Sequence, residues 1–216
     1  MNKTILYYTA NREDPVFEQK IIDDMKSKAG DMPIISVSQK PMKLGQNICI
    51  GDVGFSYLNE RKQILIAAKK AKTDYVIMSE SDFLYAPEYF NFNPSGDNIY
   101  CYDNIWIMWL SSRRRPDFKH KRAPSDGAQI VKRDFLIALL ERYLAPYPEW
   151  TLKNNDETDP RHSPYHRVPR TLFHGENPCV SIKTRLGLTF ITAVDERTSK
   201  SLPHWGDVEA LRAKFS

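Results

Sequence analysis

One stretch decides the fold of this chain: Thr73-Asp74-Tyr75-Val76-Ile77-Met78-Ser79-Glu80-Ser81-Asp82. A short apolar run leads directly into two carboxylates, Glu80 and Asp82, and residues i and i+2 of an extended segment share one face. Both can therefore point into a cleft at the carboxyl end of the strand, where open α/β sheets bind ligands. Two hard oxygen ligands there suit Mg²⁺ or Mn²⁺ with a diphosphate. An isolated triplet of this kind is more typical of an acidic turn, but the segments that precede it favour the cleft.

The segments before this stretch alternate between strand and helix. Apolar runs predict strands at residues 4–8, 33–37 and 75–78. Asp14 and Pro15 are a cap residue and a first-turn proline, which predict the start of a helix, and a second helix is expected over residues 59–72. This strand–helix–strand–helix–strand order predicts a parallel sheet with right-handed crossovers.

The second half of the chain is less regular. We expect one or two strands over residues 98–110, then a basic loop, and further strands at 128–131, 179–182 and 188–191. Helices are expected over 132–144 and 207–214, and the polar, proline-rich residues 151–170 predict a long mobile loop. The predicted fold class is α/β: a single domain over residues 1–216, with a mixed, mostly parallel sheet.

The bulk composition is that of an ordinary soluble globular protein, with 216 residues, 41% hydrophobic and 27% charged. No apolar run approaches the roughly 18 residues that span a membrane, and the N-terminal residues enter a strand directly, so neither a membrane partner nor a signal peptide is expected. Cys49, Cys101 and Cys179 form neither a metal spacing nor a disulfide framework, which indicates a reducing cytoplasm.

The net charge of +4 is concentrated in one place. Residues 113–122 hold six bases and one acid, so the rest of the chain is close to neutral. Two interpretations stay open: a solvated surface, or a grip on the phosphates of a nucleic acid, with Trp106, Trp109 and Phe118 near enough to support an unpaired base. The candidate nucleic-acid-binding residues are Arg113, Arg114, Arg115, Lys119, Lys121 and Arg122.

No glycine-rich phosphate-binding loop is present, so a bound diphosphate would need a metal and side chains. The first strand ends in Thr9-Ala10-Asn11-Arg12, where Asn can hydrogen-bond a base or ribose and Arg can pair with a phosphate. As an isolated segment it is more typical of a solvated loop.

The order of these parts resembles the nucleotide-binding half of GT-A glycosyltransferases over about residues 3–90. The resemblance implies an Arg-bearing helix, here with Arg61, leading to a strand that ends in an Asp-x-Asp metal motif. This chain has Glu80 in place of the first Asp, so the resemblance implies Asp82 as the ligand of Mn²⁺ or Mg²⁺ and Glu80 as a contact to ribose or sugar. The segments that carry it are Thr9-Ala10-Asn11-Arg12, Ser38-Gln39-Lys40, Asn59-Glu60-Arg61 and Asp74 to Asp82.

The second half, residues 91–216 with the segment just before it, is similar to a compact GT-A group found in phages. Some members of that group modify hydroxymethylated bases in DNA. The similar segments are residues 79–90, Ser125-Asp126-Gly127-Ala128-Gln129-Ile130-Val131 and Leu202-Pro203-His204-Trp205-Gly206.

Five further positions follow from these resemblances. Asp126, in a turn that faces the acceptor in such enzymes, is a candidate general base or a simple turn residue. Asp156, Glu157 and Asp159 are alternative bases within one polar segment. His204 is a candidate second metal ligand, or equally a surface histidine.

The function expected from the sequence is a metal-dependent glycosyltransferase that uses a nucleotide sugar, preferably a UDP-sugar. The expected location is the cytoplasm, which is that of the host if the chain is phage-encoded. The expected acceptor is 5-hydroxymethylcytosine in DNA, with a bacterial glycan as the alternative. A sugar nucleotidyltransferase and a non-catalytic nucleic-acid-binding module are the rival classes. The sequence is silent on the sugar, the stereochemistry and the oligomeric state. The candidate donor-binding residues are Thr9, Asn11, Arg12, Arg61, Glu80 and Lys183.

Overall fold

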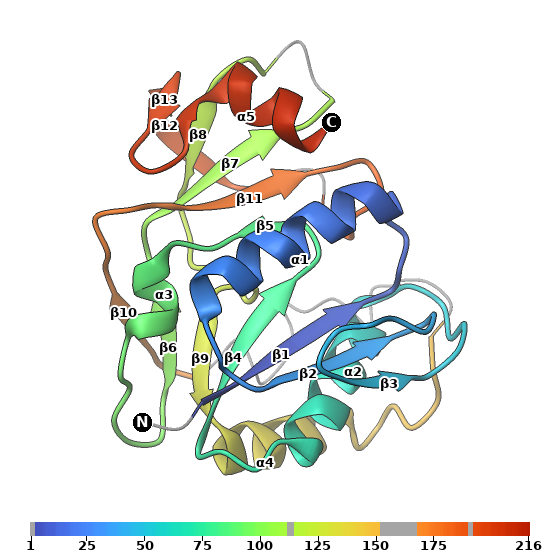
Figure 1. The fold of residues 1–216 in the computed structure, drawn as a ribbon. Helices are drawn as coiled ribbons and strands as arrows, with labels where there is room; N and C mark the ends of the chain where they lie inside the picture. The colour runs from blue at the N-terminus through green and yellow to red at the C-terminus, as the bar shows by residue number, and fades with distance from the viewer. Residues whose placement is uncertain (1–2, 112–114, 152–167, 190–191) are drawn as a thin grey trace.

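The computed structural model describes residues 3–111, 115–151, 168–189 and 192–216 (Figure 1). The helices are α1 (Pro15–Ala29), α2 (Tyr57–Lys70), α3 (Pro87–Asn91), α4 (Arg133–Leu144) and α5 (Val208–Phe215). The strands are β1 (Lys3–Thr9), β2 (Ile34–Ser38), β3 (Gln46–Cys49), β4 (Tyr75–Glu80), β5 (Phe83–Leu84), β6 (Ile99–Tyr102), β7 (Ile105–Trp109), β8 (Phe118–Lys121), β9 (Gln129–Lys132), β10 (Arg170–Phe173), β11 (Cys179–Lys183), β12 (Val194–Ser199), β13 (Ser201–Leu202) and β14 (Gly206–Asp207).

A seven-stranded sheet runs in the order β10-β6-β9-β4-β1-β2-β3. Strand β9 pairs antiparallel with both of its neighbours, and the other four pairs are parallel, which confirms the predicted α/β class with a mixed, mostly parallel sheet. Chain order reverses at β1, because β2 lies on one side of it and β4 on the other. Tyr8 and Glu80 pair at the carboxyl ends of β1 and β4, so this edge is the place where such sheets bind ligands.

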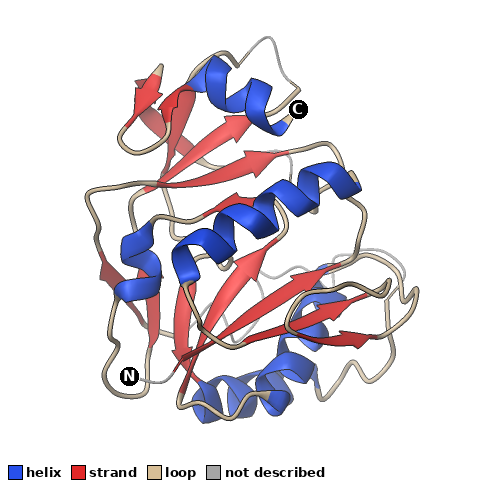
Figure 2. Cartoon of the chain, in the orientation of Figure 1, coloured by secondary structure: helices blue, strands red, loops and turns tan. Residues whose placement is uncertain are grey.

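Helices cover both faces of this sheet (Figure 2). Side chains alternate along β1, so that Ile5 and Tyr7 pack in the cluster that contains α1, whereas Leu6 and Tyr8 pack in the cluster that contains α2 and α4. The predicted start of α1 is confirmed: the Asp14 carboxylate accepts hydrogen bonds from the backbone N–H groups of the first turn, at 2.9 and 3.1 Å.

A second sheet, in the order β12-β8-β7-β11-β5, lies across α1 from the first one. In its register Lys119 lies opposite Ile107, and Ile107 lies opposite Ser181. Because alternate residues share a face, Lys119, Lys121 and Lys183 are on one side of this sheet. The other side packs on α5 and on one flank of α1.

Several expected elements are corrected. The basic stretch is not a loop over residues 118–121, which form β8. The predicted strand at 188–191 is wrong at Leu188 and Thr189, and its other two residues lie outside the described part. Most of the predicted mobile loop, residues 152–167, also lies outside it, but Arg170 already belongs to β10. Strands β3 and β12 were not expected, because edge strands exposed to water lack a clear apolar alternation.

In the described part of the chain, no helix is long and apolar enough to cross a membrane. Cys49, Cys101 and Cys179 are free thiols, and the last two are buried. Strands β5 and β11, which come from the two sides of residue 90, pair with each other.

Candidate functional site

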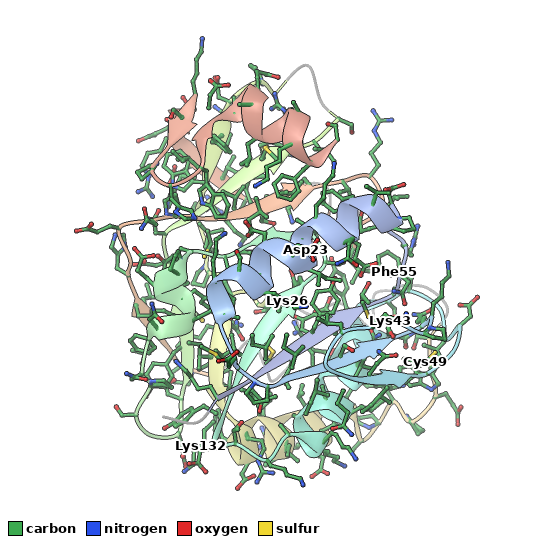
Figure 3. The ribbon with its side chains drawn as sticks, in the orientation of Figure 1. Asp23, Lys26, Lys43, Cys49, Phe55 and Lys132 are labelled. Carbon is green, nitrogen blue, oxygen red and sulfur yellow. The ribbon has the colours of Figure 1, made fainter. Side chains whose placement is uncertain are left out.

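A cavity of about 490 Å³ lies at the carboxyl ends of β1 and β4. Its walls come from the loops after β1, β2, β4 and β11, the start of α2, the segment before β9, and the start of β10. Figure 3 labels Phe55, one of the lining residues, on the side toward which β1 and β2 point. The volume is in the range typical of small-molecule and cofactor sites.

Carboxylates crowd this cavity. Burial raises the pKa of Glu80 to about 8 and that of Glu60 to about 6, and the charges of neighbouring acids add to both shifts. Burial likewise raises the pKa of Asp82, while the nearby Lys183 ammonium lowers it. Negative charge is therefore costly here, and a cation or a protonated group would relieve it.

Glu80 is held firmly by its surroundings. The Tyr8 hydroxyl donates to Glu80 Oε1 at 3.1 Å, and the Glu80 backbone N–H donates to the Tyr85 hydroxyl at 2.9 Å. A Cβ on Gly127 would lie 2.3 Å from the Glu80 carboxyl carbon, so only glycine leaves room for this carboxylate. Glu80 and Asp82 both line the cavity, in agreement with the i, i+2 argument.

Basic side chains face these acids. Arg61, buried in the first turn of α2, pairs with Asp126 through one nitrogen and lies 3.3 Å from Glu60 Oε1 through the other. Lys183, at the end of β11, lines the cavity close enough to shift the pKa values of Glu80 and Asp82. The sequence predicted both as donor-binding residues, and the structure brings them to the same cavity as Asp82.

The hydrogen-bond and ion-pair partners of Asp126 disfavour a role as general base. Its Oδ2 accepts from Arg61, and its Oδ1 accepts from Gln129 Nε2 at 2.9 Å and lies 3.1 Å from an Arg170 nitrogen. Two guanidinium groups stabilise the charged carboxylate and make it a weak base. This geometry favours a role for Asp126 in orienting Arg61 and Arg170.

The loop after β1 meets the expectations in part. Thr9 and Arg12 line the cavity, and the Arg12 guanidinium lies 4.1 Å from the centre of the Phe55 ring. Asn11 is not among the lining residues; its backbone is left-handed, with φ 51°, and its Oδ1 accepts from the Lys40 backbone N–H at 2.8 Å. Asn11 thus connects two loops.

The predicted pairing of His204 with Asp82 is not found. His204 lies in the turn between β13 and β14, with charged neighbours Lys28, Asp24 and Glu88. Lys28 is near the C-terminal end of α1, whereas the cavity lies at its N-terminal end, and a helix of 15 residues is about 22 Å long. His204 and Asp82 thus lie near opposite ends of α1, and the order of the motifs along the sequence could not show this.

The described residues of the basic stretch do not share one surface. Arg113 and Arg114 lie outside the described residues. Arg115 lies over the Trp109 ring at 4.5 Å, and Arg122 is exposed. Lys121 instead lines the cavity, and burial lowers its pKa to about 8. One member of the predicted nucleic-acid patch therefore belongs to the candidate active site, and Lys119 is on the same face of its sheet.

The residues present are compatible with Mg²⁺ or Mn²⁺. Within the described part of the chain no three His, Cys, Asp or Glu side chains cluster as a complete metal cage. A substrate-bridging Mg²⁺, however, commonly uses only one or two carboxylates together with phosphate oxygens. Asp82 is a carboxylate with hard oxygen donors in a cavity crowded with negative charge, which matches that pattern.

Sequence reasoning missed several lining residues: Tyr8, Glu13, Gln39, Phe55, Glu60 and Arg170. Glu13 and Glu60 adjoin predicted site residues, so proximity in the chain was a usable signal for them. Arg170 was expected to be the last residue of a loop, and no local pattern marked it.

Comparisons with known proteins agree on the fold alone. No protein-family model matches, and no curated protein matches. The inositol-1-phosphate CTP transferase from T. maritima superposes with a TM-score of 0.54 at 13% identity, over 100% of this chain and 96% of that one. Residues 1–349 of S. aureus TarS, in complex with UDP-GlcNAc, superpose with a TM-score of 0.50 at 12% identity, over 86% of this chain and 59% of that one. The chain has a GT-A-like fold.

The crowded carboxylates predict a pH-dependent stability. The folded-state pKa values of Glu60 and Glu80, about 6 and 8, exceed the ordinary 4.5. Between pH 5 and 8 the folded protein therefore holds more protons than the unfolded chain, and raising the pH favours unfolding. We expect the melting temperature of the ligand-free protein to fall over this range in calorimetry. Glu80→Gln should flatten the fall, and a melting temperature that rises instead would contradict this account.

Proposed function

We propose that this protein is a glycosyltransferase that moves a sugar from a nucleotide sugar, preferably a UDP-sugar, to an acceptor hydroxyl with the help of Mn²⁺ or Mg²⁺. One observation carries the proposal: the cavity at the strand-order reversal of a GT-A-like fold is lined at once by Asp82 and by Arg12, Arg61 and Lys183. A diphosphate needs that combination of a metal-binding carboxylate and fixed cations.

The chain's own residues divide the task of holding the donor. Asp82 would hold the metal, which when bound offsets the negative charge on the departing nucleoside diphosphate. Arg61 and Lys183 would pair with phosphate oxygens. The Phe55 ring and the Gln39 amide, in the same cavity, offer a flat face and a hydrogen bond to the nucleoside.

The rival activity, nucleotidyl transfer, shares this fold, as the T. maritima enzyme shows. Such an enzyme must hold a triphosphate, commonly with the backbone N–H groups of a glycine-rich loop. Here only residues 10–14 connect β1 to α1, and none is glycine. The short connection therefore favours a donor held by side chains and a metal.

The proposed acceptor is the hydroxymethyl group of a modified cytosine in DNA, with a bacterial glycan second. The basic stretch supports it, because phosphate contacts position DNA without reading its sequence. The location of Lys121 in the cavity reduces the number of charges left for this surface.

A thermal-shift screen tests the donor. We expect UDP and UDP-sugars to raise the melting temperature only with Mn²⁺ or Mg²⁺, since ligands that bind the folded state stabilise it. CTP is the comparison ligand that distinguishes a nucleotidyltransferase from a glycosyltransferase. If no nucleotide shifts the transition but DNA does, the protein is a nucleic-acid-binding module.

An acceptor panel tests the second half of the proposal. Hydroxymethylcytosine DNA, unmodified DNA and a bacterial glycan are offered with labelled UDP-sugars. Of these three acceptors, the modified DNA is expected to receive the sugar most efficiently, with an affinity that weakens steeply as salt rises. Transfer to the glycan, with no DNA affinity at low salt, removes the DNA acceptor and keeps the glycosyltransferase.

A further inference from the structure

A second cavity adjoins the first at Glu13. It has a volume of about 300 Å³, and Glu13 and Leu186 line both cavities. The remaining wall of the second cavity is mainly apolar and includes Phe17, Leu110 and Phe215. Glu13 therefore stands where a group bound in the small cavity would meet a donor bound in the large one.

The Glu13 carboxylate is buried and held in place by a hydrogen bond. Only 8% of the residue is exposed, and the Thr184 hydroxyl donates to its Oε1 at 2.6 Å. Among the described residues Oε2 receives no hydrogen bond. The pKa of Glu13 is raised to about 7. Burial is the largest cause, and the charges of Asp82 and Glu18 add to it, while the hydrogen bond from Thr184 and the Arg12 guanidinium act in the opposite direction. Such a carboxyl changes its protonation near neutral pH, as an efficient general base does.

Glu13 also lies close to the candidate metal ligand. A Cβ on Gly187 would be 3.9 Å from Glu13 Oε1 and 3.4 Å from Asp82 Oδ2. The two carboxylates thus flank one glycine, with no side chain at that position to separate them. Asp126, in contrast, is engaged by Arg61 and Arg170.

The exposed apolar residues of the small cavity indicate the kind of ligand that it would bind. Val16 and Leu186, which line it, are 64% and 41% exposed, and both are large apolar residues that folding usually buries. An apolar recess continuous with a polar catalytic cavity suits a ligand with an apolar ring or chain next to a hydroxyl.

We infer that Glu13 is the general base of sugar transfer and that the acceptor enters through the small cavity with the flat or apolar face of a ring or chain, which in the proposed DNA acceptor would be the ring of the modified base. This inference rests on the proposed function. Glu13 Oε2 takes the proton of the acceptor hydroxyl while the acceptor oxygen bonds to the anomeric carbon of the sugar. The bond from that carbon to the diphosphate breaks, the nucleoside diphosphate leaves with the electron pair, and Glu13 later releases its proton to solvent.

The test compares Glu13→Gln and Glu13→Asp with a matched control, Glu18→Gln. Glu18 is a buried acid in the first turn of α1 that accepts from the Tyr7 hydroxyl and lines neither cavity. The probes are UDP with Mn²⁺, for binding by calorimetry, and a UDP-sugar, for hydrolysis by water and for transfer to phenyl and methyl glycosides.

We expect Glu13→Gln to keep UDP affinity, to lower hydrolysis and transfer about 10²–10⁴-fold, and to lose the rise of rate with pH near 7. Glu13→Asp should recover part of the rate. Glu18→Gln should keep the wild-type rate at pH 8, and because it removes a charge that raises the pKa of Glu13, its rise of rate with pH should move to lower pH. The phenyl glycoside should have a KM about tenfold below that of the methyl glycoside, and Leu186→Ser should remove the difference.

The outcomes separate the two claims. Absent UDP binding in the wild type contradicts the proposed function. Normal turnover in Glu13→Gln, or a wild type that binds UDP yet neither hydrolyses the UDP-sugar nor transfers to either glycoside, overturns the assignment of Glu13. Equal KM values, or binding of a second copy or a polypeptide in the recess, would overturn the acceptor site.

Discussion

Asp82→Asn is expected to abolish metal-dependent binding of UDP while the protein stays folded. Asp82 lies just beyond β4, in a cavity where burial already raises its pKa, so the neutral amide removes a metal ligand and also relieves charge crowding. Loss of such an electrostatic stabiliser typically lowers turnover about 10²–10³-fold. Calorimetric titration with UDP and Mn²⁺ measures the binding, and thermal unfolding of the ligand-free variant measures the stability.

The control is Asp74→Asn, an exposed acid just before the same strand and outside the cavity. It should bind UDP and Mn²⁺ like the wild type. Undiminished metal-dependent binding by Asp82→Asn would remove Asp82 from the site. A lowered melting temperature would show that the carboxylate has a structural role instead.

Asp126→Ala is expected to lower the free energy of unfolding by about 3 kcal/mol and to weaken donor binding. The variant leaves Arg61, with 4% of its side chain exposed, and Arg170 without the carboxylate between them, and removing one partner of a buried ion pair costs about 3–5 kcal/mol. We take the lower end because the Asp126 side chain keeps 18% exposure. Chemical denaturation and UDP titration measure the two effects.

The comparison variant is Asp97→Ala, which breaks the exposed ion pair with Lys132 and should leave stability unchanged. If Asp126 is instead the general base, as the sequence suggested, Asp126→Ala and Asp126→Asn will retain donor affinity while turnover falls. That result would count against Glu13.

Local pattern was sufficient for the main helices and the buried strands of the first half. The Asp14-Pro15 cap, the apolar faces of α1 and α2, and the buried strands β1, β2 and β4 each carry a strong local signal, and the structure has all of them. The edge strands β3 and β12 carry no such signal, because they are largely exposed to water and lack a clear apolar alternation.

The candidate site follows the same division. The placement of Glu80 and Asp82 in one cavity follows from the two-residue period of a strand and from the βαβ order before it. Other contacts in the site join residues that are far apart in the sequence. Arg170 lies 44 positions from Asp126, Lys121 lies 41 positions from Glu80, and Thr184 lies 171 positions from Glu13. No local pattern encodes such contacts.

The sequence by itself therefore determined the fold class and the strand that presents Asp82, because hydrophobic period, helix capping and strand order act locally. The tertiary structure decided the rest. It placed α1 between His204 and the cavity, set Asp126 between two arginines, and buried Glu13 where two cavities meet. Those outcomes depend on how the second sheet packs across α1, and they fix which carboxylates are charged, since burial and neighbouring charges decide their protonation.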